Sequence, residues 1–262
     1  MAEFSELIET MRRDGEAWTI QVGDHWLQGR TLYGGLASAL CLQAAQNGFA
    51  GLPPLRSAQI AFIGPASGRL RLSPVELRRG KSTVYIGVDL HGEAGLATRA
   101  TFCFGAPRTS AINQTPADSL SVPDPRDCPS FFDKAPPQLR YIQHIEGRHA
   151  GGAMPFSGAD TAALLVWIRH RDPALQPSAV ALLALADAPP PAVATMLTSP
   201  GIVSTMTWSI DFLTDKITTD DGWWLVRSEA DGTADGYSYQ TIRASNRAGQ
   251  PVLVSRQSVA LF

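Results

Sequence analysis

The chain has 262 residues, of which 44% are hydrophobic, and a formal net charge of −2 at pH 7. This size and apolar content allow one large domain or two ordinary domains, each with a buried core. The near-neutral charge and lack of a basic run argue against a nucleic-acid partner. The three scattered cysteines provide neither a disulfide framework nor a zinc motif. The acidic N-terminal segment lacks an apolar signal core and no apolar run is long enough to span a membrane, so we expect a cytoplasmic protein without a membrane partner.

The first part of the chain is expected to form a central helix followed by an antiparallel sheet. Residues 4–13 have the spacing of a short surface helix, and two strand-like pieces follow it. Tyr33-Gly34-Gly35 begins a longer helix, whose buried side is mostly alanine and which ends at Asn47-Gly48. Period-two patterns then predict strands at 55–63, 69–77, 83–90 and 95–104.

Residues 106–138 contain seven prolines and little periodicity, which is typical of a linker or crossover loop. We therefore divide the chain into an N-terminal unit at 1–105, a linker at 106–138 and a C-terminal unit at 139–262. The C-terminal unit repeats the same order of elements. A helix is predicted at 178–186, stopped by three prolines, and strands are predicted at 141–148, 162–169, 203–213, 223–229, 237–245 and 252–261.

Three segments recur in the same order in both units, which indicates an internal duplication. The matching pairs are 59–64 with 209–214, 80–82 with 236–238, and 96–104 with 253–261. Comparing the copies shows where polar residues replace apolar or small ones in the second unit. Ala61 corresponds to Asp211, Ala100 to Gln257, and Leu77 to Thr233.

These three polar residues are the candidates for chemistry. Asp211 lies within an apolar strand pattern, so it is either a general base in a cleft or an acid that faces water. Gln257 offers both a donor and an acceptor and could hold a water beside a carboxylate, or it could be an exposed glutamine. The hydroxyl of Thr233 could complete a water site, although neighbouring glycines also suit a turn.

Gly34 and Gly35 add a second type of candidate, because bare N–H groups at the start of a helix can polarise a carbonyl oxygen. Their alternative role is close packing of the helix on the sheet. The five histidines show no metal-ligand spacing, and the chain has neither a GxSxG nor an HExxH motif. We therefore expect no metal and no cofactor.

The sequence resembles the double-hotdog acyl-CoA thioesterases, the acyl-CoA thioesterase II group. The resemblance covers nearly the whole chain and rests on segments of both units: GRTLYGGLASAL, LRSAQIAFIGPA and VELRRGKS in the first, and TWSIDFL, ADGYS and VLVSRQSVALF in the second. It implies an α+β fold of two hotdog units, each a central helix wrapped by an antiparallel sheet, joined into one continuous sheet. It also implies a homo-oligomer, a dimer or tetramer, active in lipid metabolism.

The resemblance further implies a catalytic Asp, a Thr or Ser, and a Gln that orient a water toward the thioester carbonyl of an acyl-CoA. By the quoted motifs these are Asp211, Gln257 and Thr233, with Ser238 as the alternative hydroxyl. Better-known members carry a His directly after the Asp, where this chain has Phe212. Two alternatives remain at this point: a hotdog protein that binds acyl-CoA without hydrolysing it, and a hotdog-type enoyl-CoA hydratase, for which the required Asp–His pair is not evident.

Overall fold

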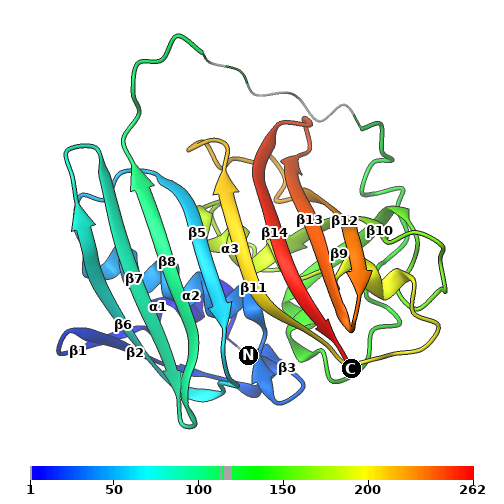
Figure 1. The fold of residues 1–262 in the computed structure, drawn as a ribbon, viewed down its shortest axis with the longest axis horizontal. Helices are drawn as coiled ribbons and strands as arrows, with labels where there is room; N and C mark the ends of the chain where they lie inside the picture. Colours follow the sequence, from blue (N-terminus) through cyan, green and yellow to red (C-terminus); the bar gives the residue numbers. More distant parts are fainter. Residues whose placement is uncertain (1, 113, 115–119) are drawn as a thin grey trace.

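A computed structural model describes residues 2–112, 114 and 120–262 of the chain. Its main feature is one antiparallel sheet, which contains twelve strands in the described residues, with two central helices against one face (Figure 1). This is the double-hotdog α+β fold that the family resemblance implied. No helix in the described part of the chain is both long and apolar enough to cross a lipid bilayer.

The first half of the sheet comes from residues before the proline-rich segment. Its strands are β1 (Arg12–Asp14), β2 (Ala17–Val22), β5 (Leu55–Phe62), β6 (Gly68–Arg79), β7 (Thr83–Gly92) and β8 (Gly95–Gly105). The helices of this half are α1 (Phe4–Glu9) and α2 (Gly34–Gly48), and a small ribbon pairs β3 (Leu27–Gln28) with β4 (Thr31–Leu32).

The second half contains the remaining six strands and the second central helix. Its strands are β9 (Ile145–Gly152), β10 (Ala163–His170), β11 (Val203–Phe212), β12 (Trp224–Ala234), β13 (Tyr237–Asn246) and β14 (Pro251–Leu261). The helix is α3 (Ala179–Ala186). The described residues also contain three short 3-10 turns, at Asp24–Trp26 in the first half and at Arg140–His144 and Ala192–Thr195 in the second.

The two halves join where β5 pairs with β11 in the order β1-β2-β6-β7-β8-β5-β11-β14-β13-β12-β10-β9. Ile60 lies opposite Trp208, and Ser57 lies opposite Asp211. The stretch around Asp211, where an acid interrupts an apolar pattern, therefore lies in the strand that joins the second half of the sheet to the first. Pairing the two edge strands satisfies backbone groups that each half alone would expose.

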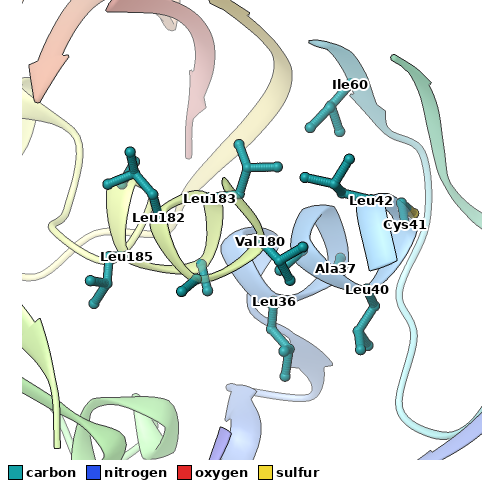
Figure 2. Packing of buried hydrophobic residues seen from close by; sticks show 14 of the residues in the cluster. Leu36, Ala37, Leu40, Cys41, Leu42, Ile60, Val180, Leu182, Leu183 and Leu185 are labelled. Atoms are coloured by element: carbon teal, nitrogen blue, oxygen red, sulfur yellow. The ribbon is translucent and has the colours of Figure 1, made fainter. Parts of the chain in front are cut away.

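The core lies between the helices and the inner face of the sheet. Figure 2 shows α2 and α3 next to each other, with Leu36 of α2 and Val180 of α3 in one apolar cluster. Helix α2 carries alanine at four positions that are almost completely buried, so its backbone can approach both the sheet and α3. Ser178 begins α3, since its side chain accepts a hydrogen bond from the N–H of Ala181 at 3.1 Å.

Most predicted elements agree with the structure, but the second strand-like piece, expected at His25–Leu27, is mostly a 3-10 turn, and the helix expected at 4–13 ends at Glu9. The strand expected at 141–148 starts at Ile145, because Arg140–His144 forms a 3-10 turn. The strand expected at 223–229 continues to Ala234, so Thr233 lies within a strand and not in the turn that its glycine neighbours suggested. The extension follows from pairing with β13, which gives those backbone groups a partner that composition alone does not reveal.

Candidate active site

A row of polar side chains crosses the inner face of the second half. Trp208 on β11 lies opposite Gln257 on β14, and Gln257 lies opposite Gln240 on β13. Residues directly opposite each other in an antiparallel pair project to the same face. Both glutamines are almost completely buried, at 4% and 2% exposure. Buried amides require hydrogen-bond partners, so this row marks a polar site inside an apolar core.

The first half has an apolar row at the equivalent place. Ala100 on β8 lies opposite Ile60 on β5 and opposite Val88 on β7. All three are buried, at 0%, 3% and 1% exposure. The same sheet position thus carries hydrocarbon side chains in one half and two amides in the other. The polar row is therefore not a requirement of the fold.

The partner of Gln257 is Asp187, a residue that the sequence analysis did not single out. Nε2 of Gln257 donates to Oδ1 of Asp187 at 2.6 Å. Asp187 is the C-cap of α3, directly after seven buried residues from Val180 to Ala186. Three prolines at 189–191 follow it and prevent the helix from continuing. The helix end therefore places one carboxylate under the inner face of β14.

Asp187 also contacts the start of α2, which belongs to the other half. The backbone N–H of Gly35 forms a hydrogen bond with the Asp187 carboxylate. A Cβ on Gly34 would lie 2.7 Å from Oδ2 of Asp187, and one on Gly35 would lie 2.5 Å from the backbone oxygen of Ala184. Glycine is needed at both positions for the helix to approach this closely. The partial positive charge of a helix N-terminus favours an anion there.

The environment of Asp187 favours its neutral form at moderate pH. Burial raises the pKa of its carboxyl to about 7, while the hydrogen bonds from Gln257 and from the Gly35 N–H act in the opposite direction. The residue keeps a partial opening to solvent. A carboxylate with a pKa near neutrality can accept a proton from water and release it again, which is what a general base requires.

Two stacked tyrosine rings lie near the same carboxyl. Tyr33 and Tyr141 have ring centroids 4.2 Å apart, at an interplanar angle of 14°. Their hydroxyls donate to backbone oxygens of the segment that carries Asp187: Tyr33 to Ala184 at 3.2 Å and Tyr141 to Ala188 at 2.8 Å. These bonds attach the residues before and after Asp187 to the tyrosine pair.

The structure does not bring Asp211 and Gln257 together. Asp211 is exposed, whereas its neighbours Ile210 and Phe212 are buried, so its side chain projects from the outer face of the sheet. Gln257 projects from the inner face. The expected arrangement, in which these two residues share one water, is therefore wrong, because the period-two alternation of β11 places Asp211 on the opposite side.

The candidate hydroxyl residues lie on the same face as Gln257. Ser238 is buried and lies opposite the buried Val259, and Oγ1 of the exposed Thr233 donates to Oγ of Ser238 at 3.0 Å. Thr205 also lies opposite Val259, on the other neighbouring strand, so its side chain points to the inner face as well. Three hydroxyls thus flank the glutamine row at one end.

Of the other expected site residues, Gly34 and Gly35 do begin a helix, and they do so at this carboxylate. Asp187 could have been found from its own signal, an acid that ends a completely apolar helix and precedes three prolines. Gln240 carries a weaker signal, an amide at a buried position of an alternating strand. Within the described residues, no group of three or more His, Cys, Asp or Glu side chains could hold a metal ion.

Comparison with known proteins agrees with this architecture. The model of the acyl-CoA thioesterase N-terminal domain matches residues 22–105, and that of the acyl-CoA thioesterase C-terminal domain matches residues 125–261. A search of curated proteins found no match.

Several solved structures share the fold over the full length. A hot dog fold protein of unknown function from Alicyclobacillus acidocaldarius is 26% identical with a TM-score of 0.89, over 100% of this chain and 99% of the other. A candidate thioesterase II from Thermobifida fusca is 19% identical with a TM-score of 0.83, over 100% and 98%. A candidate thioesterase from Novosphingobium aromaticivorans is 24% identical with a TM-score of 0.79, over 97% and 98%. On the evidence of the two domain matches, the chain belongs to the acyl-CoA thioesterase family.

Proposed function

We propose that the protein hydrolyses acyl-CoA thioesters to a free carboxylic acid and CoA at the site formed by Asp187 and Gln257. The observation that carries this proposal is the 2.6 Å hydrogen bond between Gln257 and Asp187 at the N-terminus of α2. This contact supports the proposal because a carboxylate, an amide donor and a helix N-terminus lie together in a chain of the acyl-CoA thioesterase family. A thioester is already activated, so water can attack it directly.

In the proposed mechanism, ionised Asp187 accepts a proton from a water molecule while the water oxygen attacks the thioester carbon. Gln257 donates to Asp187 through one N–H, and its second N–H is available to orient the water. The negative charge that develops on the carbonyl oxygen is stabilised by N–H groups in the first turn of α2. The C–S bond then breaks, and the CoA thiolate takes up the proton that Asp187 accepted. The products are the acid and free CoA.

We assign a hydroxyl to the same water site, with Thr205, Thr233 and Ser238 as the candidates. All three project toward the inner face near Val259, two positions along β14 from Gln257. Thr233 and Ser238 are hydrogen-bonded to each other, so each of them already has one partner. Single alanine variants at the three positions identify the hydroxyl that contacts the water, because only its removal should lower kcat strongly.

The experiment measures thiol release from a panel of acyl-CoAs, from acetyl-CoA to palmitoyl-CoA, with a thiol-reactive dye. Asp187→Asn is expected to lower kcat/KM by about 100-fold or more, as loss of a general base does. The matched control is Asp211→Asn, the same substitution on the exposed outer face, which is expected to keep wild-type activity. Full activity of Asp187→Asn, or loss of activity only in Asp211→Asn, would contradict the assignment.

The binding-only alternative is tested by the same panel. A protein that binds acyl-CoA without hydrolysing it would release no thiol from any substrate, yet would still show saturable binding of acyl-CoA. Asp211 facing solvent does not favour this alternative, because Asp187 supplies a carboxylate at Gln257 instead. A hydratase would give no thiol release either, but it would add water to an enoyl-CoA. The decrease in the absorbance of the enoyl-CoA would detect that reaction.

We further propose that the protein works in the cytoplasm as a homo-oligomer. Light scattering after size exclusion measures the assembly directly, since a monomer has a mass of 28.1 kDa. A single species at that mass would contradict the oligomer.

A further inference from the structure

Three hydrogen bonds run in series from a backbone N–H to the carboxyl of Asp187. The N–H of Ala192 donates to Oε1 of Gln240 at 2.7 Å. Nε2 of Gln240 donates to Oε1 of Gln257 at 2.6 Å, and Nε2 of Gln257 donates to Oδ1 of Asp187 at 2.6 Å. Each link joins one donor to one acceptor, and both amides are buried.

The direction of this series is fixed by its first member. A backbone N–H can only donate, so the atom of Gln240 that faces Ala192 must be the amide oxygen. The amide nitrogen of Gln240 then faces Gln257, and the oxygen of Gln257 must face it in turn. As a result the amide nitrogen of Gln257 is directed at Asp187. Either amide, if reversed alone, would place two donors or two acceptors in contact.

Both ends of the series lie in one short segment of chain. Asp187 caps α3, and Ala192 begins the next 3-10 turn five positions later. Between them stand three consecutive prolines, whose rings fix φ and limit how far the segment can move. The two glutamines on β13 and β14 therefore bridge a nearly rigid loop. This arrangement holds the distance and the angle between Gln257 and Asp187.

Packing alone does not explain Gln240. Val88 occupies the equivalent inner-face position of the first half, next to Ala100, where no amide is present. A valine therefore satisfies the fold at this position of a hotdog unit. Burying an amide in its place costs free energy unless its hydrogen bonds are complete, so the glutamine serves something other than packing.

We propose that Gln240 is a positioning residue of the active site: held by the Ala192 N–H, it fixes the orientation of the Gln257 amide and so keeps an N–H donor on Asp187. The inference rests on the proposed function, because it assigns Gln240 a role in the same site. Gln240 does not touch the reacting atoms and acts only through Gln257. A donor held on the carboxylate favours its ionised form, the form that accepts a proton from water.

The groups that face Asp187 limit what else could change its ionisation. From α2 it receives the Gly35 N–H, and from β14 the Gln257 amide. Tyr33 and Tyr141 are titratable side chains near it, and burial raises the pKa of both hydroxyls well above the ordinary value of a tyrosine. Both tyrosines remain neutral across the pH range of the test. A change in the pKa of Asp187 therefore reports on its amide donor.

The test follows the pKa of Asp187 by carboxyl carbon NMR, together with kcat as a function of pH. Gln240→Met removes both the acceptor for Ala192 and the donor to Gln257 while keeping similar bulk. It is expected to raise the pKa of Asp187 by about one unit. It is also expected to lower kcat about tenfold or more with little change in KM, because Gln257 loses its fixed orientation. Gln240→Val, which copies the residue of the first half, serves as a second variant in case the methionine packs poorly.

The decisive measurement is a double-mutant cycle with Gln257→Met. If Gln240 acts only through Gln257, then Gln240→Met changes neither the pKa nor kcat further once Gln257 is replaced. A matched control is Gln59→Met on the exposed face of β5, where the amide bonds to Ser209 and no effect is expected. Unchanged values in both Gln240 variants, or changes that simply add to those of Gln257→Met, would overturn the proposal.

The two proposals can fail separately. If no acyl-CoA is hydrolysed, the proposed function fails, but the NMR titration still shows whether Gln240 controls the pKa of Asp187. If hydrolysis occurs and the Gln240 variants behave as wild type, the thioesterase assignment stands and the positioning role is rejected.

Discussion

Replacing Asp187 with asparagine is expected to make the protein more stable relative to wild type at pH 8 than at pH 5, besides lowering its activity. Burial raises the pKa of the carboxyl to about 7 in the folded protein, against an ordinary value of 3.8. A carboxyl whose pKa is raised by folding binds its proton more tightly in the folded state. Its contribution to stability is therefore complete below about pH 4 and is lost as the pH rises through about 7. Asparagine does not titrate, so it avoids this loss.

The size of the stability change depends on how much of the pH range between about 4 and 7 an experiment covers. Between pH 5 and the folded pKa of about 7 lie about two pH units, and each unit corresponds to about 1.4 kcal/mol. The stability of Asp187→Asn relative to wild type is therefore expected to increase by up to about 3 kcal/mol between pH 5 and pH 8. Any constant cost of placing an amide next to Gly35 cancels, because it is present at both pH values.

Urea unfolding at the two pH values, followed by circular dichroism, measures this difference directly. The control is Asp211→Asn, which changes an exposed acid on the outer face and is expected to show less than about 0.5 kcal/mol at either pH. A stability difference between Asp187→Asn and wild type that is the same at pH 5 and pH 8 would refute the reasoning. It would mean that the carboxyl is not held in an environment that disfavours its charge.

Two further substitutions test the surroundings of the site. Gly35→Ala would place a Cβ 2.5 Å from the backbone oxygen of Ala184 and 2.7 Å from the ring of Tyr33. Thermal unfolding should therefore show a loss of stability of about 1–3 kcal/mol. The control Gly232→Ala, whose Cβ would have no atom within 4 Å, should be nearly neutral. Burial lowers the pKa of His170 to about 4, so its contribution to stability is present above about pH 6.5 and is lost as the pH falls toward 4. His170→Leu should remove up to about 2 kcal/mol of the change in stability between pH 7 and pH 5, and an unchanged pH profile in urea unfolding would contradict this assignment.

The sequence was sufficient to predict the order of helices and strands because those signals are local. Alternation along each strand, the glycines that begin α2 and the prolines that end α3 act within a few residues, and the structure has these elements close to the expected positions. The internal repeat then required two similar units, which the continuous sheet contains. Which residues meet across the two units depends on register, and no local signal in one sequence determines that.

The assignment of Asp211 illustrates this limit. Matching the copies by apolar pattern aligned Ile60 with Ile210, and hence Ala61 with Asp211. In the sheet, the strand neighbour of Ala100 is Ile60, and the strand neighbour of Gln257 is Trp208. Because Ala100 and Gln257 are equivalent positions, the residue equivalent to Ile60 is Trp208 and not Ile210. A shift of two residues leaves every side chain on the same face, so the pattern cannot detect it.

The replacement of Ala100 by Gln257 was informative because both residues lie on the inner face, at 0% and 4% exposure. Ala61 is only partly buried and Asp211 is exposed, so a charge at the latter position costs little and carries no functional signal. When one copy has a polar residue where the other has an apolar one, the difference therefore indicates a functional site only if the apolar residue is buried.

The duplication also explains why this site can be asymmetric. In a pair of identical subunits, a buried amide or carboxylate would appear twice, and its desolvation cost would be incurred twice. Here the first half retains an apolar row at Ile60, Ala100 and Val88, and it contributes the N-terminus of α2 and the Tyr33 ring to the site. The second half contains the carboxylate and both amides. The stability of the apolar first half offsets the desolvation cost of the polar groups buried in the second half. Because Gly35 of the first half contacts Asp187 of the second, the site depends on both halves.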